Sequence, residues 1–263
     1  MINKPVIGVA ALIFVLSATG VYYLRSRNQP LPAAPSAPAA VAPSASEPGI
    51  AHPLPEGAGN AAATPLPQLA ESDAPLREAL SQISSADAVK DFLAPQDLIR
   101  KIVVTIDNLP RQKVAVDKRP ANPAAGSFLA NGDELHATLD QRNFERYKPM
   151  IAVIGKLDAK QLGALYIHYY PLFQQSYQNL GYPNGYFNDR LVEVIDDLLA
   201  TPEPKGPIEL VRPNVMYIYA DSALEARPAG QKLLIRMGPE NAKIIKAKLT
   251  ELRAVITAGQ LKH

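Results

Sequence analysis

An uncharged run of 19 residues near the N-terminus, residues 6–24, constrains this chain more than any other feature. At about 1.5 Å per residue, a helix of this length spans roughly 28 Å, which is close to the thickness of a bilayer core. Tyr22 and Tyr23 stand near its end, where an interfacial aromatic belt belongs, and two arginines follow. The run therefore predicts a transmembrane anchor within residues 1–27 that contacts the lipid bilayer through residues 6–24.

A cleaved signal peptide is the alternative interpretation of this run, because small residues follow its most apolar part. Hydrophobicity continues to Leu24 without a clear A-x-A cleavage site, and this favours an anchor. Lys4 lies on one side of the run and Arg25 and Arg27 on the other, so the positive-inside count is nearly tied. A very short N-terminal head usually stays in the cytoplasm. We therefore expect a single-pass protein of the bacterial inner membrane with its C-terminal domain in the periplasm.

Residues 28–70 are predicted to form a disordered linker. Of the 41 residues in the stretch 28–68, 10 are proline and 12 are alanine, and none is aromatic. Such a composition cannot bury enough apolar surface to fold, and its proline density favours extended polyproline II. At about 3.1 Å per residue, the stretch can reach on the order of 130 Å. This length suggests a protein that stays at the membrane and contacts something distant from it.

Residues 71–260 are predicted to form a mostly α-helical globular domain with at most a small β hairpin. Apolar residues in the stretch 98–109 follow a 3.6-residue period, which favours a helix over the strand that their β-branched side chains also allow. Asp158 suits the N-cap of a long helix, within which Pro171 should produce a kink or a break. The stretch "VMYIYA", residues 215–220, is the best candidate for a strand.

Aromatic side chains concentrate in one part of this domain, since eight of the 17 rings in the chain lie between Tyr166 and Phe187. Most of them share one helix face, which is typical of core packing, although such a face also suits binding of sugars, peptides or a partner helix. The stretch "LGYPNGYFNDR", residues 180–190, joins two helices, and Asn188 is expected to cap the second one. The stretch is either a structural corner whose rings pack on those helices or a binding loop with exposed tyrosines.

The helix that follows this stretch is acidic, with carboxylates at positions 189, 193, 196 and 197. A solvated face is the simplest interpretation, and a site for a cation or a basic partner is the second. Paired catalytic carboxylates, as in glycan cleavage, also need a raised pKa and a cleft. The last helix starts at Gly238, where a simple helix cap is the favoured interpretation because Glu240 already supplies negative charge. An anionic or carboxylate ligand near Gln231, Lys232 and Arg236 is the alternative. The candidate residues for binding a ligand or partner are Tyr182, Asn184, Tyr186, Asp189, Arg190, Glu193, Gln231 and Arg236.

Several classes of function leave no motif in the sequence. The chain has no cysteine, which excludes disulfides, thiolate metal sites and a cysteine nucleophile. Its four histidines have no metal-binding spacing, and His168, which stands among tyrosines, is most simply a hydrogen-bonded core residue. The chain lacks the glycine motifs of nucleotide-binding proteins and hydrolases. The near balance of 27 Lys and Arg against 25 Asp and Glu gives no footprint for nucleic acid. We therefore predict no catalytic residue, no metal and no cofactor.

Four stretches of the domain resemble a known family. They are "LIRKIVVTIDNLPRQKVA", "NFERYKPM", "YPLFQQSYQNLGYPNGYFNDRLVEVIDDLLATP" and "YADSALEARPAGQKLLIRMGPENA". Over about residues 70–255 the chain is similar to the proteobacterial family known as domain of unknown function 3014. The resemblance implies one N-terminal membrane segment, a proline-rich linker and this domain, and it brings no established activity or catalytic residues.

These features together predict a membrane-anchored binding or scaffolding module of the cell envelope, with an unknown envelope protein or glycan as its partner. An envelope enzyme that acts on a glycan such as peptidoglycan is the alternative. The two hypotheses differ in one structural feature, which is whether an acid of the helix around residues 189–197 points into a pocket.

Overall fold

The computed structural model describes residues 49–55, 65–112, 118–133 and 136–258. The predicted membrane anchor and most of the predicted linker lie outside these ranges. Among the residues that are described, no helix is long and apolar enough to cross a membrane.

The described chain is mostly helical and carries a small antiparallel sheet. After a single 3-10 turn, η2 at Leu69–Glu71, the helices are α2 (Asp73–Gln82), α3 (Ala86–Phe92), α4 (Leu98–Asn108), α5 (Arg142–Glu145), α6 (Lys148–Gly155), α7 (Ala159–Asn179), α8 (Phe187–Leu199), α9 (Ser222–Glu225), α10 (Ala229–Met237) and α11 (Pro239–Ile256). The strands are β1 (Ala130–Asn131), β2 (Ala137–Leu139), β3 (Glu209–Val211) and β4 (Ile218–Tyr219).

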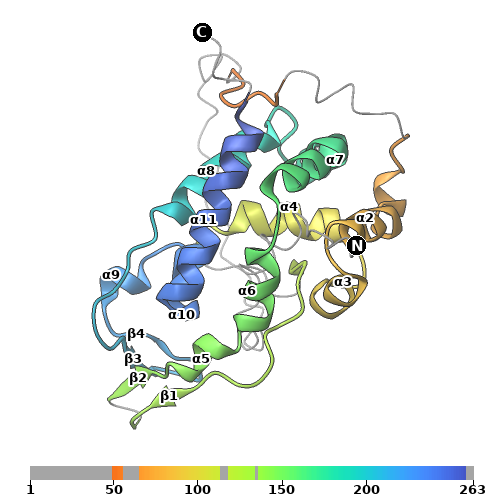
Figure 1. Ribbon diagram of the computed structural model, residues 1–263. Coiled ribbons are helices and arrows are strands. Elements are labelled where there is room, and N and C mark those ends of the chain that lie inside the picture. The colour runs from red at the N-terminus through yellow and green to blue at the C-terminus, as the bar shows by residue number, and fades with distance from the viewer. Residues whose placement is uncertain (1–48, 56–64, 113–117, 134–135, 259–263) are drawn as a thin grey trace, which may run out of the picture.

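Helix α11 is central to the helical part, because it packs against α6, α7, α8 and α10, while α4 packs across α7 and α8 (Figure 1). The stretch 98–109, whose apolar residues follow a helical period, does form a helix, α4. Leu98, Ile102 and Val103 on its apolar face are almost completely buried. The apolar faces of these helices meet in one large core. This core fixes the relative positions of α4, α7 and α8, which carry the site described below.

Helix α7 begins as predicted, because the Asp158 carboxylate accepts the backbone N–H groups of Lys160 at 2.7 Å and Gln161 at 3.1 Å. These two bonds lower the pKa of the Asp158 carboxyl. The helix then runs through Pro171 to Asn179 as one element, so it is not split there. Buried side chains on both sides of the proline hold the helix against the core and offset the hydrogen bond that the proline cannot make.

The predicted cap of the next helix was wrong. The N-cap of α8 is Tyr186, and Asn188 lies inside the first turn with its side chain fully buried. The Asn188 side chain bonds to groups far away in the sequence instead of to its own helix start. Tertiary packing therefore overrides the local capping preference at this position.

The sheet lies at the end of the molecule opposite α7 (Figure 1). Its order is β1-β2-β3-β4, and all neighbouring strands are antiparallel, with Ala137 opposite Leu210 and Leu210 opposite Tyr219. Strand β4 falls within the predicted "VMYIYA" stretch. A hairpin was the largest sheet expected, whereas four short strands are present. Strands β2 and β3 are separated by the whole segment 140–208, so local sequence pattern does not indicate their pairing.

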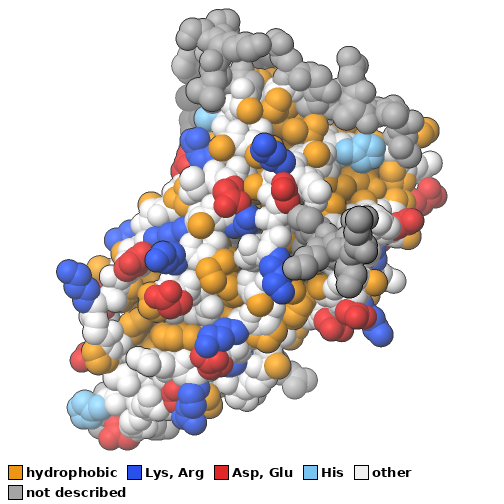
Figure 2. Space-filling model, in the orientation of Figure 1, with side chains coloured by type: hydrophobic (Ala, Val, Ile, Leu, Met, Phe, Trp, Pro, Cys, Tyr) orange, Lys and Arg blue, Asp and Glu red, His pale blue; other side chains and the backbone are white. Residues whose placement is uncertain are grey.

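Charged side chains of both signs are interspersed over the face of the molecule shown in Figure 2, without a large patch of one sign. Binding sites on this protein are therefore better argued from local geometry than from a long-range field.

Candidate functional site

The stretch of residues 180–190, which we call the aromatic corner, connects α7 to α8 through a turn whose rings pack on α7. Phe187 is fully buried and stacks on Phe173, with ring centroids 5.8 Å apart and planes 2° from parallel. Tyr182 stacks on Tyr177, with centroids 4.6 Å apart. Tyr186 is only half-buried. The turn is thus held in place by ring packing, as the interpretation as a structural corner predicts.

A buried carboxylate ties the aromatic corner to α4. The side chain of Asp107 is only 5% exposed, and its Oδ2 accepts hydrogen bonds from Arg111 Nη2 at 2.6 Å and from the Tyr182 hydroxyl at 3.3 Å. Arg190 Nη2 donates to the Asp107 carbonyl at 2.7 Å, while Arg190 Nη1 donates to Glu193 at 2.8 Å. The Arg190 guanidinium therefore bridges α4 and α8, and it also binds the Glu193 carboxylate on its own helix.

A cavity of about 320 Å³, which we call the corner cavity, opens beside this cluster. Five of the eight candidate residues from the sequence lie in its wall, although they come from the turn and from α8. The lining residues are Asp107, Tyr177, Tyr182, Tyr186, Asp189, Arg190 and Glu193.

The other three candidates do not join the corner cavity. Asn184 is exposed at the tip of the turn. Gln231 is buried in α10 and donates to the carbonyl oxygen of Asp197 at 2.7 Å and to its carboxylate at 2.9 Å. The Arg236 guanidinium lies 5.2 Å from the ring centroid of Tyr219 in the sheet. Gln231 and Arg236 therefore hold α10 to its neighbours, and the structure does not bring them near the aromatic corner.

Residues 49–55, which we call the docked segment, lie against the start of α8 (Figure 1). The Asp189 carboxylate accepts the backbone N–H groups of Ala51 at 3.1 Å and His52 at 2.6 Å. The Asn188 amide donates to the carbonyl of His52 at 2.8 Å. The side chains of Asn188 and Asp189 therefore bind both N–H groups and a carbonyl group of the segment's backbone.

The third contact to the docked segment comes from Tyr186, whose hydroxyl accepts the backbone N–H of Leu54 at 3.3 Å. The Leu54 side chain packs against the main core. Pro53, which has no N–H, lies between the donating residues and is exposed. The corner thus binds three backbone N–H groups, one backbone carbonyl and one apolar side chain of the segment.

Asn188 is positioned for this role by the core. Its Oδ1 accepts the hydroxyl of Tyr166 at 3.1 Å, and its Nδ2 also reaches the carbonyl of Ile256 at 3.3 Å. Burial raises the pKa of Tyr166, so its hydroxyl remains a proton donor at any physiological pH. The Asn188 amide is therefore fixed by buried partners and does not need to be ordered on binding.

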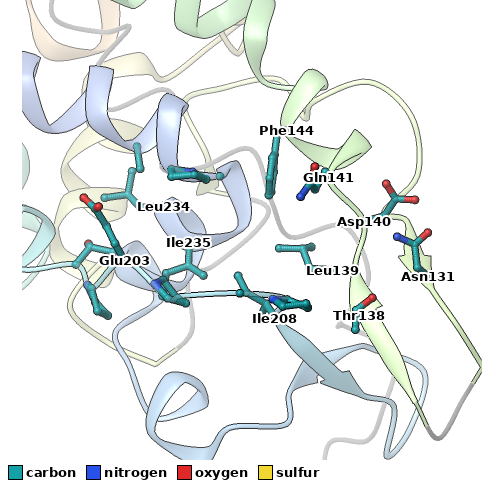
Figure 3. A pocket seen from close by; sticks show the side chains of 18 of the residues that line it. Asn131, Thr138, Leu139, Asp140, Gln141, Phe144, Glu203, Ile208, Leu234 and Ile235 are labelled. Carbon is teal, nitrogen blue, oxygen red and sulfur yellow. The ribbon is translucent and has the colours of Figure 1, made fainter.

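A second and larger cavity, of about 740 Å³, lies at the sheet end of the molecule (Figure 3). We call it the sheet-end cavity. Its walls come from β2, from α5, from the proline-rich crossing at residues 201–208 and from the junction of α10 with α11. Its apolar lining includes Leu139, Phe144, Ile208, Leu234 and Ile235.

Sequence reasoning missed four features of these sites, namely Asp107, the binding role of Asn188, the docked segment and the sheet-end cavity. Asp107 had a usable signal, because it follows Val103 by four positions and so lies on the buried face of α4. The predicted linker gave no sign that its residues 49–55 contact the domain. The backbone of the segment makes the bonds to Asp189, Asn188 and Tyr186, and bonds of this kind leave no pattern in the sequence.

The family model described as "Protein of unknown function (DUF3014)" matches residues 98–253. No curated protein and no solved structure matches the chain. The matched range starts at α4 and ends within α11, so it includes both cavities and leaves out the docked segment.

Proposed function

The chain belongs to the DUF3014 family of proteins of unknown function, and we propose that its domain is a binding module that holds a peptide segment at the aromatic corner. The observation that carries this proposal is the docked segment itself. Its backbone is bound by the side chains of Asp189, Asn188 and Tyr186, all of which lie at the start of α8.

The contacts to the docked segment define what a partner must offer. They go to backbone N–H groups at positions 51, 52 and 54 and to one carbonyl, so any segment with the same backbone groups can form them. Position 54 adds a side-chain requirement, because Leu54 packs against the core. The partner is therefore a peptide with an apolar residue three positions after its first donor, and from the first donor to the third it can carry proline only at the position that corresponds to Pro53.

The docked segment occupies this site in the same chain, so a partner has to compete with it. A segment of the same chain has a high effective concentration at such a site, on the order of millimolar. A partner can displace it by making additional contacts. The corner cavity is the place for such contacts, because Tyr186 and Asp189 bind the segment and also line this cavity. The three tyrosines in the wall of this cavity provide large apolar surfaces with polar groups, which are typical of interfaces.

A spin-label experiment on the full chain tests this proposal. The chain has no cysteine, so Pro53→Cys accepts a single nitroxide at an exposed position that donates no backbone hydrogen bond. We expect an immobilised spectrum, because the residues on both sides are bound. Asp189→Ala removes the acceptor of two N–H groups and is expected to weaken docking by roughly tenfold or more, which releases the label.

The matched control is Asp196→Ala, since Asp196 lies on the same helix and pairs with Arg253 at 2.6 Å instead of with the segment. Added peptide with the sequence of residues 49–55 should also release the label, whereas the same peptide with proline at the position of His52 should not. An equally mobile label in the parent and in Asp189→Ala would contradict the docking. Failure of the added peptide to displace the segment would contradict a peptide-binding site.

The glycan enzyme remains the rival hypothesis, because Asp189 and Glu193 do line a cavity. A glycan-cleaving pair needs one carboxyl group that carries a proton to the leaving oxygen. Here all three carboxylates of the cavity already accept hydrogen bonds, Asp107 and Glu193 from arginines and Asp189 from two backbone N–H groups. This arrangement favours binding over hydrolysis. Release of soluble fragments from purified peptidoglycan by the protein would decide for the enzyme.

The cellular setting that we propose is the periplasmic face of a bacterial inner membrane. It is supported by the uncharged run of residues 6–24 and by the proline-rich stretch after it. Mass spectrometry of protein extracted from membranes tests this location. A mature N-terminus near residue 19 would replace the anchor with a signal peptide.

A further inference from the structure

The sheet-end cavity has polar groups at its two ends and an apolar middle. Figure 3 shows Glu203 at one end and Asn131 at the other, with Leu139, Phe144 and Ile208 between them. Its volume of about 740 Å³ falls within the range of roughly 300–1,000 Å³ that is usual for sites that bind small molecules. A ligand that fills it has to place apolar groups in the middle and a polar group at an end.

The end near Glu203 carries an ammonium group with unused donors. Lys246 Nζ donates to the carbonyl of Thr201 at 2.6 Å, and its distance of 3.9 Å to the Glu203 carboxylate is too long for a hydrogen bond. The Lys246 side chain is 20% exposed, while that of Glu203 is 70% exposed. An ammonium has three donors, and among the residues that the structure describes only the Thr201 carbonyl accepts one of them, so two remain for a ligand. The position of Glu203 also shows that a carboxylate fits next to this lysine.

The other charged group in the lining is not available in the same way. The Asp140 carboxylate accepts hydrogen bonds from the backbone and guanidinium groups of Arg142, and these bonds lower its pKa. Within the described ranges, the side-chain amides of Asn131 and Gln141 have no hydrogen-bond partner. The cavity therefore offers one cation with spare donors and, at the far end, two neutral amides.

From this arrangement we infer that the sheet-end cavity binds an apolar molecule that carries one carboxylate. The carboxylate pairs with Lys246, and the apolar body lies against Leu139, Phe144 and Ile208. A sugar fits less well, because the lining has one aromatic ring and few free polar groups. A cationic ligand would lie next to Lys246. This inference is independent of the peptide site, because the two cavities share no residue.

Two pairs of probes test this site. Within each pair, an acid and its neutral amide show how much the carboxylate contributes to binding. Between the pairs, the comparison shows whether the ligand is an acyl chain or the C-terminal end of a peptide. Octanoate and octanamide represent an acyl chain, and N-acetyl-Ala-Val-Leu and its C-terminal amide represent the end of a peptide. Binding to the isotope-labelled full chain is followed by the NMR shifts of residues that line the cavity. We expect the carboxylate of at least one pair to bind about tenfold or more tightly than its neutral amide.

Lys246→Met and Glu203→Gln are expected to change binding in opposite directions, so general damage to the protein cannot imitate the result. Lys246→Met should weaken binding of the carboxylate by about tenfold to a hundredfold, and Lys246→Arg should restore part of it. Glu203→Gln should tighten binding, because it removes the competing carboxylate from an exposed position. Lys243→Met is the control, since Lys243 lies on the same helix, is exposed and is outside the cavity.

The outcome of the probes also identifies the source. Binding of octanoate supports an acyl ligand, and binding of only the tripeptide acid supports a peptide C-terminus. Equal binding of an acid and its amide, or shifts that Lys246→Met leaves unchanged, would overturn the role of Lys246. Absence of cavity shifts with all four probes would overturn the site.

Discussion

The two ends of the molecule hold their shape by different means. The corner end is fixed by large stacked rings, with Phe187 and Tyr182 packed on α7, and its polar side chains bind a peptide segment. The sheet end has strands of two or three residues, a small separate core and a cavity of about 740 Å³ beside it. The same helix, α8, connects the regions, because it starts at the corner and ends at the proline-rich crossing.

The two ends differ in whether the residues that stabilise the fold are also the residues that line the binding site. At the corner, the apolar rings provide the stability, so Asp189 and Tyr186 can bind the segment without being needed for folding. At the sheet end, the same residues form the fold and the cavity, because Leu139 and Ile235 belong both to the small core and to the cavity wall. Substitutions should therefore separate binding from stability at the corner and should couple them at the sheet end.

The largest expected effect is at the corner. Phe187→Ala removes a fully buried ring that stacks on Phe173, and it should lower the free energy of unfolding by about 3–5 kcal/mol. Tyr186→Ala removes a half-buried ring whose hydroxyl binds Leu54, and it should cost about 1 kcal/mol or less. Denaturant melts of the two variants measure both values. Equal and large losses would mean that the whole corner is core, which would remove the proposed separation of binding from stability.

An intermediate effect is expected at the sheet end, at Gly238. This residue has a φ of +86°, and a Cβ there would lie 2.5 Å from Cγ of the Phe144 ring, which also lines the cavity. Gly238→Ala should therefore cost about 2–3 kcal/mol, from backbone strain and from displacement of the ring. The same melts test this value, and NMR shifts around the cavity should change with it.

Gly206→Ala is the control for the strain alone. Gly206 has a similar φ of +82° and also lines the cavity, but a Cβ there would meet no atom within 4 Å. We expect a cost of about 1 kcal/mol from the left-handed backbone conformation. If the two variants lost equal stability, contact with Phe144 would not constrain Gly238.

The two ends also differ in how far the sequence predicts them. Helices depend on residues that are close in the sequence. The period of apolar residues therefore predicted α4, and the capping residue Asp158 predicted the start of α7. The concentration of aromatic residues indicated the turn between α7 and α8. The sheet end joins segments near residues 130, 138, 210 and 219, each too short to show a period. Pairing of such strands depends on contacts between distant residues, and so does the sheet-end cavity. The docked segment escaped prediction because bonds made by its backbone leave no signature in its composition.

The smallest effect is expected at Asp197, near the other end of α8 from Asp189. Burial raises the pKa of the Asp197 carboxyl, although a hydrogen bond from Gln231 opposes this shift. Because the folded protein binds this proton more tightly than the unfolded chain does, this group adds stability as pH falls toward its unfolded pKa of about 3.9. At pH 7 the ionised group costs stability. Asp197→Asn should therefore stabilise the protein at pH 7 by a few tenths of a kcal/mol.

The pH dependence distinguishes this charge effect from a change in packing. The advantage of Asp197→Asn over the parent should shrink as pH falls from 7 to 3.5, because the parent carboxyl becomes neutral as well. Asp158→Asn should show the opposite sign, since the pKa of Asp158 is lowered by the N–H groups that it caps. That variant should lose stability at pH 7, and the loss should disappear only below the lowered pKa of the carboxyl. Urea melts at several pH values measure both trends, and a pH-independent gain at Asp197 would assign it to packing against Gln231.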